Sequence, residues 1–136
     1  VTLAPADRQA VEAAGSMSAV PAIWAYRARP VKVIDGDTLD VALDAGFRNF
    51  REERLRLLGV NTPERKGETR KAGDAARLFV VDWLSWLEGL EWPLTVLTAK
   101  SDAFGRYLAR IWRTTDGRCL NDDLLAAGHA VRFMAD

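Results

Sequence analysis

Hydrophobic and polar positions alternate in the first half of the chain, in two stretches separated by a turn-like segment. Residues 31–44 (VKVIDGDTLDVALD) alternate on both sides of an Asp-Gly-Asp interruption, and residues 50–60 (FREERLRLLGV) alternate again. A period of two is typical of strands with one buried face. The pattern therefore predicts three strands, with turns at residues 35–37 and 44–49.

The hydrophobic period becomes helical from residue 74 onward, which predicts a helix. Its apolar positions are Ala76, Phe79, Val80, Trp83 and Leu87. Gly89 follows them as a helix terminator. Beyond the helix, residues 93–99 (PLTVLTA) and 106–112 (RYLARIW) are expected to form strands.

The C-terminal segment predicts a second short helix and a short strand. Residues 121–128 (NDDLLAAG) carry Asn121 at the N-cap position and Gly128 at C′. Residues 129–134 (HAVRFM) suit a last strand. Three strands, one helix, two strands and one helix predict a small closed antiparallel barrel, in a mainly β fold with α (α+β). The fold class we expect is a five-stranded OB-fold barrel with two to three helices.

The length of 136 residues is typical of one domain with its own core. We expect residues 1–22 to form an N-terminal extension, with a short helix over residues 4–14, and residues 23–136 to form the domain. Pro30 favours an irregular or edge-like conformation over residues 15–30.

Composition excludes several classes of protein. No apolar run reaches the about 18 residues that a membrane span needs, so we expect no membrane partner. We expect a monomer. The lack of a visible leader favours a cytoplasmic protein, and a leader removed before Val1 would instead make it secreted. The single cysteine and single histidine exclude an internal disulfide and a Cys- or His-based zinc site. A formal net charge of zero argues mildly against a strong non-specific polyanion binder.

Asp35-Gly36-Asp37 places two carboxylates inside a run that otherwise predicts sheet. In a strand, Asp35 and Asp37 would point to one face, and hard divalent cations bind clustered carboxylates. Gly36 would allow a bulge that turns both acids toward one point. The alternative is a hairpin turn, for which Asp-Gly is the strongest short signal. This stretch alone leaves both interpretations open.

Arg56 lies in an apolar strand segment, where a guanidinium needs water, a carboxylate or a phosphate. A solvent face shared with Arg54 would also satisfy it. Downstream, Asn61 and Thr62 offer oxygen atoms, and Glu64 follows a proline. An asparagine before Thr-Pro is also typical of a plain turn.

Arg106 follows Gly105 in DAFGRYLA, a second turn-like segment. A hairpin there would aim the guanidinium inward. The alternative is a hairpin with a G1 bulge and a solvated arginine.

Four segments of the chain resemble the staphylococcal nuclease-like (thermonuclease) domain family. They are VIDGDTL (33–39), RLRLLGVNTPE (54–64), DAFGRYLA (102–109) and LNDDLLAAGHA (120–130), and they occur in the family's order. The resemblance implies an OB barrel with helices for the domain. It also implies a calcium-dependent phosphodiesterase, an endonuclease that hydrolyses DNA and, as a second candidate, RNA. The expected substrate is a nucleic acid, with single strands favoured and little sequence specificity.

The resemblance further implies a Ca²⁺ site. Asp37 matches a direct calcium ligand, and Asp35 matches an outer carboxylate of that site. The carbonyl of Thr62 matches a further ligand. Asn61 stands where the best-known members have a second ligating aspartate, which makes this site one charge less negative.

The catalytic residues that the resemblance implies are Arg56, Glu64 and Arg106. Glu64 matches the carboxylate proposed as general base for the attacking water. The two arginines match those that hold and neutralise the phosphate.

Nucleic-acid contacts are expected from two places. The family's Lys-Tyr pair before Gly-Arg is Ala103-Phe104 here, so a cation and a hydroxyl are lost, and Phe104 keeps a ring for base stacking. The basic loop residues are Arg65, Lys66, Arg70 and Lys71. They would track backbone phosphates, or they form a solvated surface loop.

Two other functions compete with a calcium nuclease. The first is a catalytically weak or inactive OB-fold module that binds nucleic acid or protein; Asn61 and the neutral net charge favour it, whereas the joint presence of the acids and arginines opposes it. The second is another kind of metal nuclease, using Asp37 with Glu64-x-Lys66. Such a site normally lies on a mixed sheet flanked by helices, which the predicted element order does not suggest.

Overall fold

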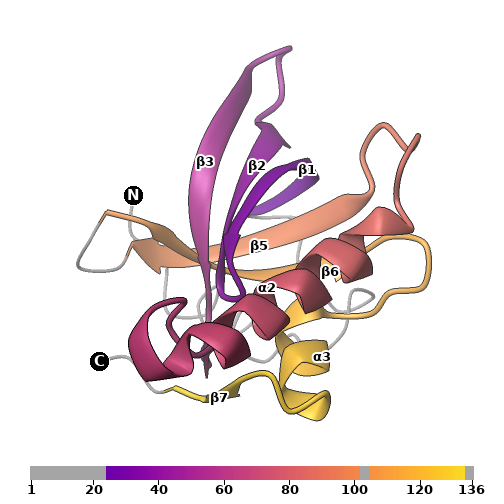
Figure 1. Ribbon diagram of the computed structural model, residues 1–136. Helices are drawn as coiled ribbons and strands as arrows, with labels where there is room; N and C mark the ends of the chain where they lie inside the picture. The colour runs from indigo at the N-terminus through magenta and orange to yellow at the C-terminus, as the bar shows by residue number, and fades with distance from the viewer. Residues whose placement is uncertain (1–23, 102–104, 134–136) are drawn as a thin grey trace.

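The computed structural model describes residues 24–101 and 105–133 (Figure 1). The N-terminal extension with its expected helix, and Phe104, lie outside the described residues.

Five strands close into a barrel in the order β1-β2-β3-β6-β5, and β5 pairs back onto β1. The strands are β1 (Ala25–Asp35), β2 (Thr38–Asp44), β3 (Phe50–Leu57), β5 (Leu94–Ser101) and β6 (Tyr107–Arg113). Neighbouring strands are antiparallel except β3 and β6, which are parallel. The predicted mainly β fold with α, built on an OB-fold-like barrel, is confirmed.

β1 begins earlier than the sequence pattern indicated. The expectation of irregular chain up to residue 30 is wrong from Ala25 onward, because Ala28 pairs with Leu43 of β2 and with Leu94 of β5. Pro30 itself lies beyond the residues paired with β5, and a register shift follows it. A proline is tolerated at this position because it has no backbone N–H to donate, and on the β5 side of β1 no strand in the described part of the chain is there to accept a hydrogen bond.

Two α-helices and one 3-10 helix accompany the barrel in the described part of the chain. They are η2 (Gly67–Thr69), α2 (Arg70–Ser85) and α3 (Leu120–Ala126). α2 packs against β1 and α3 and runs across one end of the barrel (Figure 1). Its buried positions Ala76, Val80 and Trp83 follow the predicted apolar face. The helix ends at Ser85, before the predicted Gly89.

Asn121 does not cap α3, so that prediction is wrong. The N-cap position is Cys119, and Asn121 is 1% exposed inside the first turn. Its Nδ2 donates to the carbonyls of Leu58 (2.9 Å) and Ala109 (3.0 Å), and its Oδ1 accepts from the backbone N of Ile111 (3.2 Å). Asn121 therefore fastens α3 to β6 and to the end of β3.

A two-stranded sheet lies beside the barrel and confirms the predicted last short strand. β4 (Val60–Asn61) pairs antiparallel with β7 (Val131–Arg132). This pairing fixes the backbone of Asn61, a predicted site residue. No helix in the described ranges is both long and apolar enough to cross a membrane.

Candidate active site

Gly36 and Asp37 are the two turn residues of the β1–β2 hairpin, because Asp35 pairs with Thr38. The hairpin interpretation of this stretch is therefore correct, and the turn also carries the candidate site. A Cβ on Gly36 would lie 2.8 Å from Cβ of Ala76 and 2.9 Å from Cγ2 of Thr62. Glycine is required here because α2 and the segment after β4 press against the turn.

Asp37 is a buried carboxylate, 8% exposed. Its Oδ2 accepts a hydrogen bond from the backbone N of Thr62 (3.0 Å), and its Oδ1 accepts one from the Thr38 hydroxyl (3.1 Å). Nη2 of Arg56 lies 3.4 Å from Oδ2. A buried charge needs such partners, and through them Asp37 joins the hairpin turn to the Thr62 segment.

Arg56 is also buried, 9% exposed. Its Nη1 donates to the carbonyls of Leu57 (3.0 Å) and Val60 (2.8 Å), and its Nη2 donates to Oδ1 of Asn61 (3.1 Å). The strand-borne arginine thus faces a carboxylate, one of the alternatives that its sequence context allowed. Arg56, Asp37 and Asn61 form one polar cluster.

Arg54 does not belong to this cluster. It is exposed, and its Nε and Nη2 donate to the two carboxylate oxygens of Asp40 (2.8 and 3.1 Å). The hydrogen bond from Arg54 lowers the pKa of Asp40 below its usual 3.8. The two arginines of β3 therefore have separate partners.

Thr62 places a buried hydroxyl beside the cluster. The residue is 5% exposed, and its Oγ1 has no hydrogen-bond partner although it is buried. Such an unsatisfied oxygen is uncommon in a folded protein.

Glu64 is exposed on the loop that leads to α2, and its Oε2 lies 3.6 Å from Nζ of Lys66. Its backbone is held tightly, however. A Cβ on Gly73 of α2 would lie 2.6 Å from the carbonyl oxygen of Glu64 and 2.7 Å from that of Pro63. Gly73 was not predicted as a site residue. A glycine inside a helical stretch is the signal that indicates such a close approach.

Arg106 is half-buried and directly precedes β6. In the parallel pairing of β3 and β6, Leu108 lies opposite Arg56. Because side chains alternate along a strand, Arg106, two residues before Leu108, extends the strand face that carries Arg56.

Asp35 is much more exposed than Asp37 and meets another arginine. Its side chain is 43% exposed, and its nearest ion-pair partner is Arg65, with Nη1 3.8 Å from Oδ1. The two acids of the turn therefore meet different arginines.

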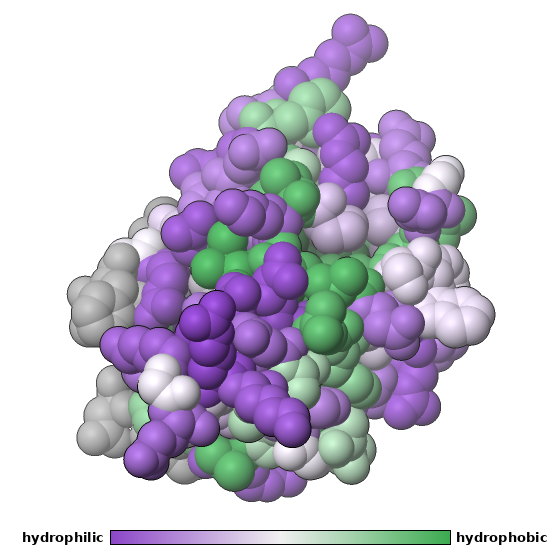
Figure 2. Space-filling view, viewed as in Figure 1, coloured by the Kyte–Doolittle hydropathy of each residue, from purple (hydrophilic) through white to green (hydrophobic). Residues whose placement is uncertain are grey.

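The four basic residues expected to contact nucleic acid differ in their surroundings, and the prediction that all four lie in a loop is wrong. Arg70 and Lys71 begin α2, because the helix starts four residues before the predicted residue 74. Arg65 holds the loop in place, because its Nε donates to Asp74 (2.8 Å) and its Nη1 to the carbonyl of Ile34 (2.8 Å). The hydrogen bond from Arg65 lowers the pKa of Asp74 below 3.8. Lys66, Arg70 and Lys71 are exposed, and hydrophilic residues gather over this part of the face (Figure 2).

The donor atoms around Asp37 are of the kind that a hard cation binds. The Asp37 carboxylate, the Asn61 amide oxygen and the unpaired Thr62 hydroxyl are all oxygens, which suits Ca²⁺ better than zinc. Across residues 24–101 and 105–133, no three His, Cys, Asp or Glu side chains come together as a metal-binding group. The oxygens therefore fit calcium in type, with only one negative charge inside the cluster.

Comparison with protein-family models found no match to this chain, and a search of curated proteins found none either. The functional conclusion accordingly depends on the geometry of the Arg56, Asp37 and Asn61 cluster and on the residues beside it.

Proposed function

We propose that this protein is a calcium-dependent phosphodiesterase with a staphylococcal nuclease-like domain, cleaving DNA and also RNA with little sequence specificity. The observation that carries the proposal is the burial of Arg56 and Asp37 at a 3.4 Å separation, with the amide of Asn61 on the same guanidinium nitrogen. A buried ion pair is often no more stabilising than an apolar pair, so keeping one here suggests a chemical use.

Asp37, Asn61 and the carbonyl of Thr62 would hold the calcium ion. The bound ion would stabilise negative charge that develops on the phosphoryl oxygens. Arg56 already carries part of the same electrostatic task, because its positive charge lies beside the ligand oxygens. Its Nη1 and Nη2 groups already contact Leu57, Val60, Asn61 and Asp37, so binding a phosphate would require the guanidinium to exchange some of these partners.

Glu64 would accept the proton of the attacking water. Its carboxylate is exposed to solvent, and the contact of its backbone with Gly73 fixes where the side chain starts. Arg106, on the strand face that carries Arg56, would supply the second positive charge to the phosphate. Two guanidiniums and one base meet the needs of phosphodiester hydrolysis.

A non-catalytic binding module is the second candidate, and one observation favours it. Asp37 is compensated by Arg56, and Asn61 adds no charge, so the cluster is electrically balanced without any ion. A module that had lost catalysis would tolerate that arrangement. The closed barrel, in contrast, offers no support for the acid-acid-lysine nuclease built on Asp37, Glu64 and Lys66.

Cleavage assays test the proposal. The protein is incubated with single-stranded DNA, duplex DNA and RNA in calcium, in magnesium and in chelator, beside Glu64→Gln and Arg56→Lys. We expect calcium-dependent cleavage, reduced at least about 100-fold in both variants, as for loss of one general base or one bidentate phosphate contact. Glu52→Gln, an exposed change on β3, is the matched control and should cleave normally.

Three outcomes would redirect the assignment. Absence of cleavage in every metal would exclude the enzyme and favour the binding module. Wild-type rates in Arg56→Lys and Glu64→Gln would exclude the assigned roles. A preference for magnesium would support the acid-acid-lysine alternative.

A further inference from the structure

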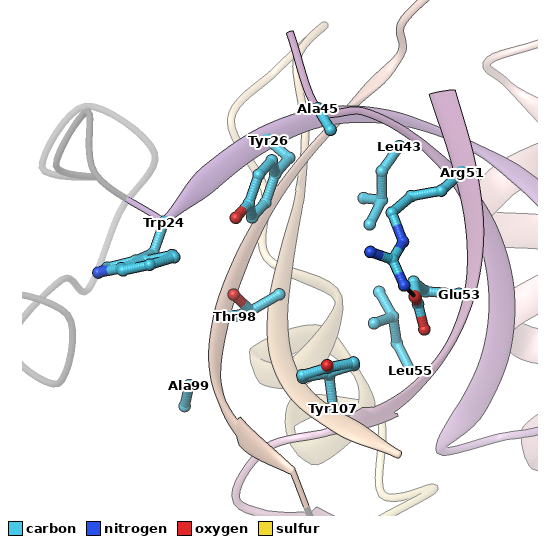
Figure 3. A pocket seen from close by; sticks show the side chains of 10 residues that line it. All are labelled: Trp24, Tyr26, Leu43, Ala45, Arg51, Glu53, Leu55, Thr98, Ala99 and Tyr107. Carbon is cyan, nitrogen blue, oxygen red and sulfur yellow. Dashed lines mark ion pairs between the residues drawn. The ribbon is translucent and has the colours of Figure 1, made fainter. Parts of the chain in front are cut away.

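The barrel has an open mouth lined by the end of β2 and by β3 from Arg51 to Leu55. A pocket of about 260 Å³ lies in this mouth (Figure 3). It is lined by Trp24, Tyr26, Leu43, Ala45, Arg51, Glu53, Leu55, Thr98, Ala99 and Tyr107. Pockets for drug-sized ligands have about 300–1,000 Å³, so this one suits a ligand near the size of a single ring system.

The β3 wall of the mouth carries charged side chains at positions that face the barrel interior, where apolar residues would be expected. Residues 51, 53 and 55 of β3 share a strand face, and Leu55 is completely buried. The residues that face them on β2 are all buried and apolar. Yet Arg51 and Glu53 occupy this face as an ion pair, with the Glu53 side chain only 19% exposed (Figure 3).

Aromatic and aliphatic residues line the rest of the opening. Tyr26 of β1 and Tyr107 of β6 lie around the same opening as the Arg51–Glu53 pair, with the Thr98 hydroxyl between the strands (Figure 3). Tyr107 is 41% exposed, so its ring is within reach of a ligand. Rings supply stacking surfaces, and the ion pair supplies both a hydrogen-bond donor and an acceptor.

The mouth adjoins the proposed phosphate site. Leu55 and Tyr107 line the pocket and pair with each other across β3 and β6. Arg56 and Arg106 are their neighbours in sequence and lie on the opposite strand face. A nucleic-acid strand that crosses this rim would meet arginines on one side and the pocket on the other.

We propose that the barrel mouth binds one unpaired nucleobase of the substrate, with Tyr107 as a stacking wall and Glu53 as a hydrogen-bond acceptor. This inference rests on the proposed nuclease function and adds a base subsite to it. A free phosphate would have to compete with Glu53 for Arg51 and would leave the rings without a stacking partner. An aliphatic ligand would leave the ion pair desolvated without new partners. A base in a duplex keeps its pairing edge occupied, so such a subsite would select single strands.

Binding to a short fluorescent single-stranded DNA, in chelator so that no cleavage occurs, tests this inference. The variants are Tyr107→Leu, Glu53→Gln and, as the matched control, Trp86→Leu, which changes an exposed aromatic residue at the C-cap of α2 (77% exposed). We expect Tyr107→Leu to raise Kd about tenfold, the scale of one base–aromatic stack, and Glu53→Gln to raise it severalfold. An oligonucleotide with abasic residues should bind all four proteins equally.

Three results would overturn the inference. The first is an unchanged Kd in both pocket variants, and the second is an equal rise of Kd for the abasic oligonucleotide. The third is a failure of the native protein to bind the DNA. Thermal midpoints of the variants show whether each is folded. The proposed function fails separately: base-dependent binding without cleavage in any metal would leave the subsite standing and remove the nuclease.

Discussion

Nη2 of Arg56 lies 3.4 Å from Oδ2 of Asp37, and each side chain is only 11% exposed. The contact joins β3 to the turn of the β1–β2 hairpin, where the backbone N of Leu57 also donates to the carbonyl of Asp37 (2.8 Å). A side-chain contact and a backbone hydrogen bond thus both link the two elements that carry the candidate site, and only the first depends on Arg56. Removal of the side-chain contact should therefore affect folding and chemistry in different ways.

Arg56→Met should lower the free energy of unfolding by about 3–5 kcal/mol, because it leaves the buried Asp37 carboxylate without its counter-charge. The double variant Asp37→Asn, Arg56→Met should recover much of this loss, since an asparagine keeps the acceptor for the Thr62 N–H and carries no charge. Both proteins should be inactive as nucleases. Urea denaturation and DNA cleavage measure the two effects separately.

Arg54→Met is the matched control for Arg56→Met. The Arg54–Asp40 pair is exposed on the arginine side (52%), so its loss should cost no more than about 1 kcal/mol. Equal destabilisation by the two substitutions would contradict the distinct role given to Arg56.

Gly73→Ala should destabilise the protein by about 1–3 kcal/mol, the usual cost of overpacking. In an ordinary helix interior the same change stabilises by about 0.5–1 kcal/mol. The sign reverses here because the new Cβ would lie 2.6 Å from the carbonyl oxygen of Glu64. Cleavage should fall as well, because the displaced segment carries the proposed base.

Ala75→Gly, at an exposed position of the same helix, is the control and should cost about 1 kcal/mol by helix propensity alone. A more stable Gly73→Ala protein with full activity would show that the close contact does not position Glu64.

The strand pattern predicted the barrel well, and the reasons are local. Alternation over residues 38–44 and 50–57 marks the face that lines the barrel, although Ala42 and Arg56 on the opposite face are buried as well. The parallel β3–β6 pair was not predicted, because the order of the elements indicated antiparallel neighbours throughout. Asn121 shows the limit. Its position before a helical run is typical of a cap, whereas its side chain instead satisfies backbone groups of β6 and the end of β3.

The sequence indicated which residues could form the candidate site better than it indicated how they are arranged. The apolar neighbours of Arg56 in sequence indicated that its guanidinium needs a polar partner, and Asp37 is such a partner in the structure. The divergence of Asp35 toward Arg65 was not predictable, because it depends on where the loop before α2 lies. The role of Gly73 also needs the tertiary contact with Glu64.

Acid should destabilise the protein over a defined range of pH. Hydrogen bonds from arginines hold the pKa values of Asp40, Asp74 and Asp116 below the usual 3.8. A carboxyl with a lowered pKa in the folded state binds its proton more readily when unfolded, so stability rises with pH. The contribution is present above pH 3.8 and is lost as the pH falls through the lower, folded-state values.

Urea midpoints measured from pH 7 down to pH 2 test this prediction, with Asp74→Asn as the variant. The variant should show a shallower loss of stability below pH 3.8, because one acid with a lowered pKa is removed. Parallel acid limbs in the variant and the native protein would exclude a contribution from the Arg65–Asp74 pair.

Asn61→Asp should tighten calcium binding about tenfold, because the number of ligand charges sets the affinity of calcium sites. The new carboxylate would stand where Oδ1 of Asn61 now accepts from Arg56 (3.1 Å), beside the Asp37 carboxylate. The shift of the thermal midpoint with calcium concentration measures the affinity, since a ligand of the folded state stabilises it by mass action. Asn49→Asp, an exposed change in the β2–β3 turn, controls for added charge and should leave the calcium dependence unchanged. If the thermal midpoints of the Asn61→Asp and native proteins depend equally on calcium, the ion binds elsewhere. If only Asn61→Asp shows a larger calcium-dependent shift, Asn61 is a ligand position.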